Sequence, residues 1–348
     1  MNKRILIISR NGNPMPPRTQ MILDILGQNY DVDLIDVKPI ENWTRRINYL
    51  SLYYFDLVNS RKLRKHLKDY DAIMIKDLQF LPLAKVAKKM GKFVVYETLD
   101  FNPQLRYYGL SLQFPWMNKM PWIKEKAEQI EKQFVEKYVD QIMVNSDALK
   151  EHFGKDAIVN YYSSPFEKID ASNRADRPVA LLYLGHFSRE KGGDEMLDLQ
   201  QKYKLPLYIF GGVEQMDLQK RIESVKQIKH FERLPADDLA RELGIVLNNY
   251  YLFGLSLIHN ANESYAVQNA NKDIDYLSMG IPLIGNHRKT TEEIVQQGCG
   301  FFVENAEQII KLEQERKQDL TNICRQFYQN TFSNNQFAKN LLKTFDKL

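Results

Sequence analysis

Short runs of apolar residues alternate with amphipathic stretches along the first half of the chain. The apolar runs are rich in Ile and Val and lie at residues 5–9, 32–37, 72–76, 93–97 and 141–146. Between them, residues 81–90 and 123–138 repeat their apolar positions with a helical period. Because buried parallel strands read as continuous apolar runs separated by helices, this pattern predicts a parallel sheet with helices on both faces.

The second half of the chain repeats the same pattern. Its apolar runs, each expected to form a strand, lie at residues 179–185, 205–212, 244–250 and 281–286. A polar segment at about 165–178 separates the two halves, which predicts an α/β protein of two doubly wound, Rossmann-like domains, 1–170 and 171–330. Ligands of such folds bind at the carboxyl ends of the strands, so we expect a cleft there.

Residues 331–348 are predicted to form a C-terminal helix. Phe337, Leu341, Leu342 and Phe345 share one face of this helix. The pattern alone allows the helix to pack on its own domain or on the first domain.

Composition and charge narrow the possible functions. The 348 residues include 44% hydrophobic and 26% charged residues, which is ordinary for a folded protein, and the net charge of +4 is too small to indicate nucleic acid as a partner. Cys299 and Cys324 have neither metal-ligand spacing nor a disulfide framework, which favours a reducing, cytoplasmic compartment. The apolar run near the N-terminus is too short for a signal peptide, and no segment is apolar enough to span a membrane.

The segment 183–199 predicts one phosphate-binding element. It reads as a strand, a glycine at Gly185, a basic loop with Arg189 and Lys191, and a helix that starts near Gly193. The glycine permits a close approach of the backbone to a ligand, and both cations lie beside helix amides that favour anions. The alternative is an ordinary strand-to-helix turn with solvent-facing charges.

The segment 269–286 predicts a second phosphate-binding element. It reads as a helix from about Asn271 to Met279, capped by Asn269 or Asn271 and followed by a buried strand. Lys272 adds a cation to the first turn, and Asp275 lies one turn later on the face of Asn271. A diphosphate at the amides and a ribose hydroxyl on the carboxylate would fit. The alternative is a capped surface helix with a solvated acid.

These motifs, in this order, resemble the large retaining GT-B glycosyltransferase family that includes many bacterial polysaccharide and lipopolysaccharide enzymes. The resemblance covers about residues 179–303. The matching positions are Gly185 to Lys191-Gly192, the strand ending at Gly211 and Gly212, the strand and helix at 228–243, Asn271-Lys272, Asp275-Tyr276-Leu277, Gly280-Ile281-Pro282, Glu293-Ile294 and Gly298 to Gly300.

The resemblance implies a metal-independent transfer of a sugar from a UDP- or GDP-linked donor to a glycan or lipid-linked acceptor, with retention, in surface polysaccharide synthesis. It also implies that the C-terminal helix crosses back to the first domain. Lys191 would contact the donor phosphates, assisted by Arg189 or by the amides of Asn271 and Lys272. Asp275 would replace the ribose-binding glutamate of the family, and Gly185, His186 and Gly211 would border the donor.

The sequence departs from the family pattern at three donor positions, one of which is Asp275, an acid one methylene shorter than the usual glutamate. His186 stands where many members have arginine, and Val267 stands where the family often has a glutamate that holds the donor sugar. Glu263 and Gln268 are the nearest polar substitutes.

Residues that follow predicted strands of the first domain are candidates for the acceptor side, because carboxyl-end loops collect functional groups. Glu97 and Asp100 are the catalytic candidates after the strand at 93–97, although Asp100 could instead cap the following turn. Gly12, Arg18 and Arg106 are the acceptor-binding candidates.

Two Asp-x-Asp strings invite comparison with a metal-binding motif. Residues 31–33 lie in a predicted strand, and residues 273–275 lie in a predicted helix, where side chains two positions apart diverge. We therefore predict no metal site. Fixed cations and helix amides can stabilise a leaving diphosphate without one.

Aromatic and basic residues are interleaved in two segments of the first half. Residues 41–68 are basic and rich in aromatics, and residues 105–122 contain Phe114, Trp116 and Trp122. Such a composition could dock on an anionic membrane surface at the inner face of the cell membrane, form an acceptor-binding loop, or place aromatics in the core.

Two other functions fit the same fold. A sugar-nucleotide 2-epimerase would convert the donor in the absence of an acceptor, but such enzymes group acidic and histidine residues around the cleft. The chain has six His and no evident His cluster. A non-catalytic GT-B partner subunit is the second alternative, suggested by His186 and Val267.

Overall fold

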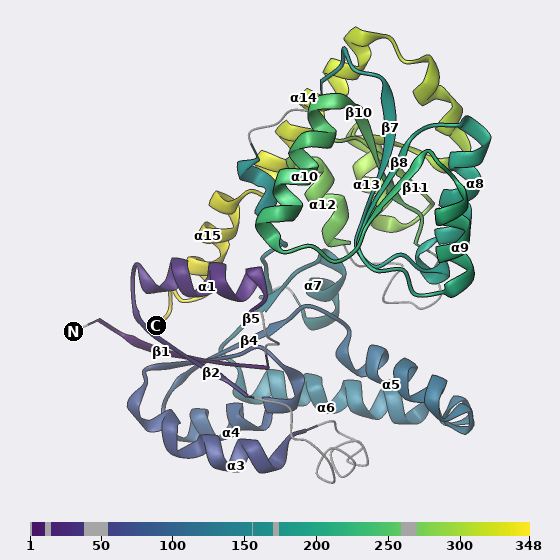
Figure 1. The fold of residues 1–348 in the computed structure, drawn as a ribbon. Coiled ribbons are helices and arrows are strands. Elements are labelled where there is room, and N and C mark those ends of the chain that lie inside the picture. Colours follow the sequence, from purple (N-terminus) through teal and green to yellow (C-terminus); the bar gives the residue numbers. More distant parts are fainter. Residues whose placement is uncertain (1, 11–14, 38–54, 155, 170–173, 259–269) are drawn as a thin grey trace. The chain divides into compact units, whose positions relative to one another are not determined.

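The computed structural model describes residues 2–10, 15–37, 55–154, 156–169, 174–258 and 270–348. Its contacts divide the chain into two compact units (Figure 1). Unit 1 comprises Met1–Tyr161 together with Phe337–Leu348, and unit 2 comprises Tyr162–Gln336. The division falls between Tyr161 and Tyr162, whereas the sequence placed the domain boundary at 170/171.

Unit 1 is built on a six-stranded sheet in which every strand pair is parallel. The spatial order β2-β1-β3-β4-β5-β6 reverses direction between β1 and β3. The strands are β1 Arg4–Ser9, β2 Asp31–Asp36, β3 Ala72–Ile75, β4 Phe93–Thr98, β5 Gln141–Val144 and β6 Ile158–Val159. The five strands predicted in this half are confirmed, and β6 was not predicted.

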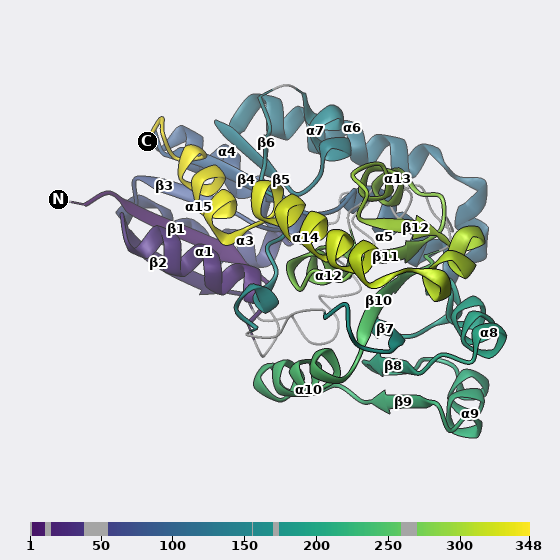
Figure 2. The same ribbon diagram turned by 90° about the horizontal axis from the view of Figure 1, so that it is seen from above.

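Helices cover both faces of this sheet (Figures 1 and 2). They are α1 Pro17–Gly27, α3 Leu57–Leu63, α4 Pro82–Lys89, α5 Asn102–Gln113, α6 Trp122–Tyr138 and α7 Asp147–Phe153, with 3-10 turns η1 Arg64–Asp69, η2 Leu78–Phe80 and η3 Pro115–Lys119. Alternate residues of β1 enter different cores: Leu6 and Ile8 pack with α3, α4 and α6, whereas Ile5 and Ile7 pack with α1. Both faces are apolar, which is why the strands read as continuous apolar runs.

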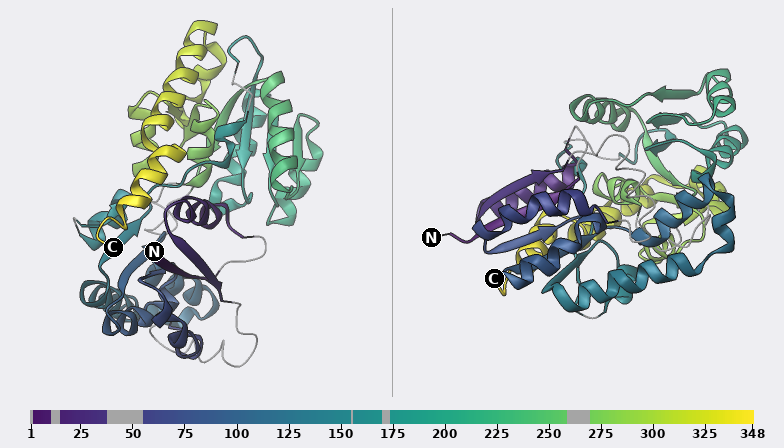
Figure 3. Two further views of the ribbon diagram at one scale, coloured as in Figure 1. Left: turned by 90° about the vertical axis from the view of Figure 1, so that its left-hand side faces the viewer. Right: turned by 90° about the horizontal axis from the view of Figure 1, so that it is seen from below.

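The C-terminal segment packs on unit 1. Helix α15, Asn334–Lys343, carries Phe337 and Leu341 into the core formed by β1, β3 and α1, and Phe345 follows them (Figure 3). The return of the C-terminal helix to the first half of the chain agrees with the expectation from the resemblance. Burying three large apolar side chains contributes roughly 5 kcal/mol or more to holding this segment in place.

Unit 2 is built on a second six-stranded parallel sheet with the order β12-β11-β10-β7-β8-β9. Read from β7, this is the Rossmann order, with its reversal between β7 and β10. The strands are β7 Val179–Leu184, β8 Leu207–Phe210, β9 Ile228–Phe231, β10 Tyr251–Ser256, β11 Leu283–Gly285 and β12 Gly300–Phe302. The prediction of two doubly wound domains is confirmed.

The helices of unit 2 lie on both faces of its sheet (Figure 2). They are α8 Gly193–Tyr203, α9 Met216–Ser224, α10 Ala236–Asn249, α12 Asn271–Ser278, α13 Lys289–Gln296 and α14 Gln314–Thr331, with 3-10 turns η4 Pro165–Lys168, η5 Arg189–Lys191 and η6 Val303–Lys311. Met196, Leu218 and Ile222 of α8 and α9 bury against β7 and β8 in one core.

The strand predicted at 244–250 is wrong, because most of this run is the end of α10. Leu243, Val246 and Leu247 follow the helical period and are buried, while the strand begins only at Tyr251. The apolar residues of the helix and the strand adjoin in the sequence, so a continuous run concealed the boundary.

Within the described residues, no helix is long and apolar enough to cross a membrane, and no group of His, Cys, Asp or Glu side chains could hold a metal ion. Asp31 and Asp33, from the first Asp-x-Asp string, both pair with Arg4.

Candidate functional site

The candidate site lies at the carboxyl ends of β7 and β10 in unit 2. The strand order reverses between these two strands, which leaves their ends open to a ligand in folds of this kind. Three segments converge there: the loop after β7, the loop after β8, and the N-terminus of α12. These segments include both phosphate-binding elements predicted from the sequence.

Glycines let the loops at this edge pack tightly. Gly185 and Gly211 have φ of 111° and 141°, and a Cβ on Gly211 would lie 2.1 Å from the carbonyl oxygen of Gly185. Gly192 has a left-handed φ of 79°, and a Cβ there would lie 2.1 Å from the carbonyl oxygen of Leu257. No other residue type fits at Gly192 or Gly211 without displacement of the backbone, so the loop that carries Lys191 is held closely against the end of β10.

Tyr276 fixes α12 to the ends of the two strands. Its hydroxyl accepts a hydrogen bond from the amide of Leu184 at 3.0 Å and lies 3.2 Å from the carbonyl of Leu255. Its ring occupies the space beside Gly254, where a Cβ would lie 2.3 Å from a ring carbon. One buried side chain therefore connects β7, β10 and α12, and it sets the position of the α12 N-terminus.

A cluster of cations surrounds the first turn of α12. Lys272 is buried, and its ammonium lies 4.3 Å from the centre of the Tyr183 ring. Burial is the main reason that the pKa of Lys272 falls to about 7; the charges of Arg288 and Lys191 act in the same direction, and Asp273 opposes them. Among the described residues, the side chains of Lys272, Arg288 and Lys191 thus lie near the carboxylate of Asp273, an arrangement that an anionic ligand would complement.

Arg288 is the functional candidate that the sequence did not reveal. It is buried, and its guanidinium donates to Asp273 at 2.9 Å and to the hydroxyl of Ser256 at 3.0 Å. The pair joins the end of β10, the turn before α13 and the first turn of α12. The short segment after β11 has no motif that marks Arg288, because its partners are brought together only by the fold.

The other expected donor-binding residues are placed differently. Arg189 is exposed and pairs with Asp194 at 3.0 Å and with Asp217, and these acidic partners hold its pKa above the usual value. His186 is about half exposed, and its ring lies 3.5 Å from a carboxylate oxygen of Glu214. The charges of Arg189 are directed to α8 and α9 rather than to the cation cluster.

The N-terminus of α12 lacks the asparagine cap that was expected. Ala270 is the N-cap and Asn271 is the first helical residue, while Asn269 lies outside the described residues. Val267, Glu263 and Gln268 also lie outside them. Among the described residues no side chain caps this helix, and in its first turn the amide of Asp273 donates to the carbonyl of Ala270 at 2.9 Å.

Asp275 is turned toward the segment that enters unit 2. Its Oδ1 accepts a hydrogen bond from Ser164 at 2.7 Å, and it is also hydrogen-bonded by Tyr162. Burial raises the pKa of Asp275 to about 7, against the effect of these hydrogen bonds. A ribose hydroxyl at this carboxylate would share it with Ser164 and Tyr162.

In unit 1, Glu97 and Arg18 form a buried ion network. Glu97 has no exposed surface and lies 2.8 Å from Arg18 and 3.2 Å from Lys76. These cations lower the pKa of Glu97 although burial acts in the opposite direction. Arg18 also donates to the carbonyls of Asn160 and Tyr161, where the chain leaves unit 1. Glu97 and Arg18 therefore hold the structure together rather than contact a ligand.

Asp100 lies between β4 and α5, half-buried, and its carbonyl accepts a hydrogen bond from the Thr98 hydroxyl at 3.0 Å. It remains the candidate of unit 1 that lies beyond a strand end with part of its surface open. Gly12 and the side chain of Arg106 lie outside the described part of the structure.

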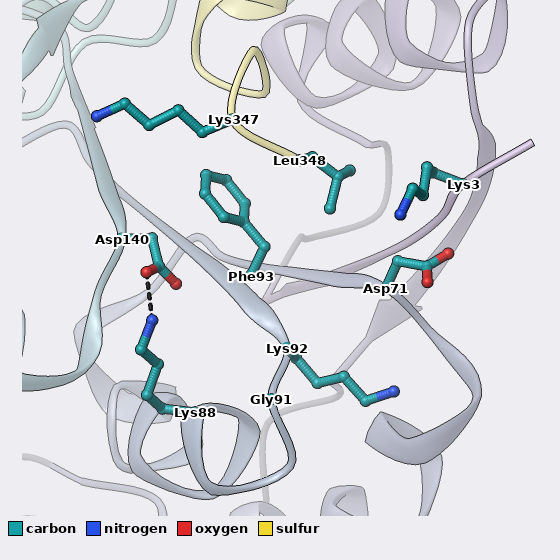
Figure 4. A pocket seen from close by; sticks show the side chains of 9 residues that line it. All are labelled: Lys3, Asp71, Lys88, Gly91, Lys92, Phe93, Asp140, Lys347 and Leu348. Atoms are coloured by element: carbon teal, nitrogen blue, oxygen red, sulfur yellow. Dashed lines mark hydrogen bonds and ion pairs between the residues drawn. The ribbon is translucent and has the colours of Figure 1, made fainter.

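A hollow of unit 1 lies at the amino ends of β3, β4 and β5, on the other side of the sheet from Asp100 (Figure 4). It has a volume of about 370 Å³ and is lined by four lysines beside Phe93 and Leu348. Two of the four lysines have partners: Lys88 pairs with Asp140, and Lys92 donates to the carbonyl of Lys68. The lysine ammonium groups point in different directions in Figure 4, so this hollow does not form a convergent anion site.

Comparison with known proteins gives matches only in structure. No family model matches the sequence, and no curated protein matches it. The structure of Anabaena HepE in complex with UDP is 12% identical and has a TM-score of 0.68, with 99% of this chain and 100% of that chain covered. A trehalose-6-phosphate synthase, studied for glycosyl transfer with retention, is 10% identical with a TM-score of 0.63 and 99% of both chains covered.

A third similar structure is that of a Listeria monocytogenes protein assigned as a UDP-N-acetylglucosamine 2-epimerase. It is 10% identical and has a TM-score of 0.58, with 100% of this chain and 96% of that chain covered. Likeness at this level of identity shows the fold. The chain has the GT-B architecture of two Rossmann-like domains, as the sequence motifs indicated.

Proposed function

We propose that the protein is a glycosyltransferase that takes its sugar from a UDP-linked donor. The observation that carries the proposal is the cation cluster at the N-terminus of α12, in which Lys272 is buried beside Arg288 and Lys191, with Asp273 as the carboxylate that pairs with Arg288. A diphosphate would supply the missing negative charge. The choice of uridine is supported by the HepE complex with UDP, which has the same fold.

The same groups can assist the bond cleavage. Transfer leaves negative charge on the departing diphosphate, and fixed cations together with helix amides stabilise that charge as it develops. Lys272 is positioned by the Tyr183 ring and by the attachment of α12 through Tyr276, so little rearrangement is needed during reaction. We propose that this arrangement permits metal-independent transfer, with retention as in the structurally similar trehalose-6-phosphate synthase.

For the acceptor side, we propose Asp100 as the group that positions the acceptor hydroxyl. It lies at the carboxyl edge of the unit 1 sheet, beyond the end of β4. We further propose a glycan or lipid-linked acceptor, a role in surface polysaccharide synthesis and a cytoplasmic location. The two free, buried thiols of Cys299 and Cys324 fit a reducing compartment.

Ligand-dependent thermal stability tests the donor site. UDP is expected to raise the melting temperature of unit 2 more than CMP does, because CMP lacks the second phosphate. Lys191→Ala and Lys272→Ala should each weaken UDP binding about tenfold or more, since each removes a cation from a partly desolvated site. Lys220→Ala, at an exposed position of α9, is the matched control and should bind like wild type. Equal UDP binding by all four proteins would refute the proposal.

Incubation with UDP-N-acetylglucosamine alone distinguishes a transferase from an epimerase. An epimerase is the alternative that the structural similarity to the Listeria protein supports. A transferase releases UDP slowly by hydrolysis, whereas an epimerase produces the C2 epimer without release of UDP. A non-catalytic partner subunit would do neither, and Lys191→Ala would then leave any transfer reaction unchanged.

A further inference from the structure

Helices α5 and α6 of unit 1 form an antiparallel hairpin whose closed end lies apart from the sheet. The two helices contact each other along their length and are joined by residues 114–121, which include the 3-10 turn η3. In Figure 1 the closed end is the blue-teal tip at the far right of unit 1. We refer to residues 114–126, from the turn to the first residues of α6, as the hairpin tip.

The hairpin tip exposes three large aromatic side chains. Phe114, Trp116 and Trp122 are 47%, 59% and 51% exposed. The rings of Phe114 and Trp116 lie next to each other, with their centres 6.4 Å apart. Neighbouring exposed aromatic residues of this size are unusual on the surface of a monomeric soluble protein, and they indicate an interaction site.

The exposure of these rings is not caused by a lack of packing at the tip. Met117 and Ile123, from the same segment, are 7% and 5% exposed and belong to the unit 1 core. The hydroxyl of Tyr107 in α5 donates to the carbonyl of Met117 at 2.7 Å, which fixes η3 to the hairpin. The tip therefore buries one set of apolar side chains and presents the three aromatic rings outward on a fixed turn.

The hairpin tip carries a net positive charge. Lys119 and Lys126 are exposed and Lys124 is partly exposed, whereas Glu125 is the one acidic residue of the segment. Lysines on four-carbon stems can keep their ammonium groups at lipid phosphates while neighbouring rings enter the interface. Three lysines against one glutamate make the tip complementary to an anionic surface.

We propose that the hairpin tip docks the protein on a bilayer surface that contains anionic phospholipids. Phe114, Trp116 and Trp122 would enter the headgroup region, where amphipathic aromatic rings are favoured, and the lysines would contact lipid phosphates. A protein partner fits less well. A stable protein interface needs roughly 800 Å² and about 20 residues on each side, whereas this patch is a convex tip with three rings.

Docking of this kind deepens the proposed function, because it would hold unit 1 at the surface where a lipid-linked acceptor resides. It does not depend on the donor site. Vesicle binding can therefore succeed or fail independently of UDP binding, and the two proposals are separately testable.

Vesicle flotation with the full-length protein tests the docking. Vesicles of phosphatidylglycerol mixed with phosphatidylcholine should carry the protein, whereas vesicles of phosphatidylcholine alone should carry much less, and high salt should reduce binding. Trp116→Ser combined with Trp122→Ser should weaken binding about tenfold or more. Lys119→Glu combined with Lys126→Glu should also weaken it.

Matched controls lie in unit 2. Met216→Ser removes an apolar side chain that is 78% exposed, and Lys220→Glu reverses an exposed charge of α9. Both controls should float like wild type, and far-UV circular dichroism should show that all variants are folded. In wild type, lipids brominated on their acyl chains should quench tryptophan fluorescence.

Three outcomes would overturn the proposal. The first is that folded wild-type protein does not float with anionic vesicles. The second is that the tip variants and the unit 2 controls bind equally. The third is that the tip variants abolish a concentration-dependent self-association in sedimentation velocity while vesicle binding is unchanged, which would assign the tip to a protein partner.

Discussion

Replacement of Lys272 by Met should stabilise the protein while it removes donor binding. The ammonium of Lys272 is buried in the absence of ligand, beside Arg288 and Lys191 and against the ring of Tyr183. A methionine has a similar length and no charge, so it can fill the same space without the desolvation penalty. Its thioether can still pack against the ring.

The size of the effect follows from the pKa of Lys272. The pKa falls from 10.5 to about 7, and at roughly 1.4 kcal/mol per pKa unit the buried ammonium destabilises the fold by about 5 kcal/mol. The lost attraction between the cation and the ring offsets roughly 1 kcal/mol of this gain. We therefore expect Lys272→Met to raise the free energy of unfolding by about 4 kcal/mol at pH 7.

The gain must depend on pH in a defined direction. Between pH 7 and 10.5 the unfolded wild-type chain binds a proton at Lys272 that the native protein lacks, so the stability of wild type rises with pH. The variant lacks this dependence. Its advantage should be largest at pH 7 and below, fall by about 1.4 kcal/mol for each pH unit above 7, and vanish near the unfolded pKa.

Denaturant unfolding at several pH values from 7 to 10 measures this difference. The three tryptophans all belong to residues 1–161, so far-UV circular dichroism, which also reports on unit 2, is the appropriate signal. Lys220→Met, at an exposed position, is the matched control and should change stability little. If Lys272→Met destabilises the protein at pH 7, or if its advantage is the same at every pH, the ammonium is not desolvated and the reasoning is refuted.

Three further predictions concern the buried carboxyl groups of Asp275 and Glu97 and the loop at Gly192. Burial raises the pKa of Asp275 from 3.8 to about 7, because ionising the buried carboxyl is unfavourable. With respect to this group the protein is most stable below pH 3.8, and it loses stability as the pH rises through 7. Asp275→Asn should therefore be more stable than wild type at pH 8, and should lose that advantage toward pH 4 in thermal melts. Glu97→Gln leaves the cations of Arg18 and Lys76 without a carboxylate and should destabilise unit 1 by about 3 kcal/mol, read by tryptophan fluorescence during unfolding. Gly192→Ala, at a φ of 79° and against the end of β10, should weaken UDP binding in calorimetry by displacing the loop.

The alternation of strands and helices could be predicted because the central strands are buried on both faces. Leu6 and Ile8 enter one core and Ile5 and Ile7 the other, so all four central positions of β1 are apolar. The same rule failed at 244–250, where apolar residues of α10 are followed directly by those of β10. Continuous apolar character indicates burial, but it does not separate a helix end from a strand.

The candidate site was predictable where its signals are local. Lys191 and Lys272 each lie in a short segment that contains a glycine turn or a helix start, and the structure brings them close enough to influence one pKa. Arg288 could not be found in this way, because its partners Asp273 and Ser256 come from other segments. Position after a strand suggested a ligand contact for Glu97, yet the strand end is covered and the carboxylate has no exposed surface.

In the proposed donor site, binding of an anion beside helix α12 would offset the cost of burying charged side chains there. Residues 272–278 are all buried, and among them Lys272 and Asp275 are both shifted toward neutrality by burial. Lys272 recovers a favourable environment only when an anion occupies the space beside it, so part of the binding energy appears as protonation of this side chain. Binding of UDP at pH 8 should then be accompanied by proton uptake, which calorimetry in two buffers of different ionisation enthalpy would detect. Lys272→Met should abolish that uptake, whereas a persistent uptake would mean that a group other than Lys272 senses the diphosphate.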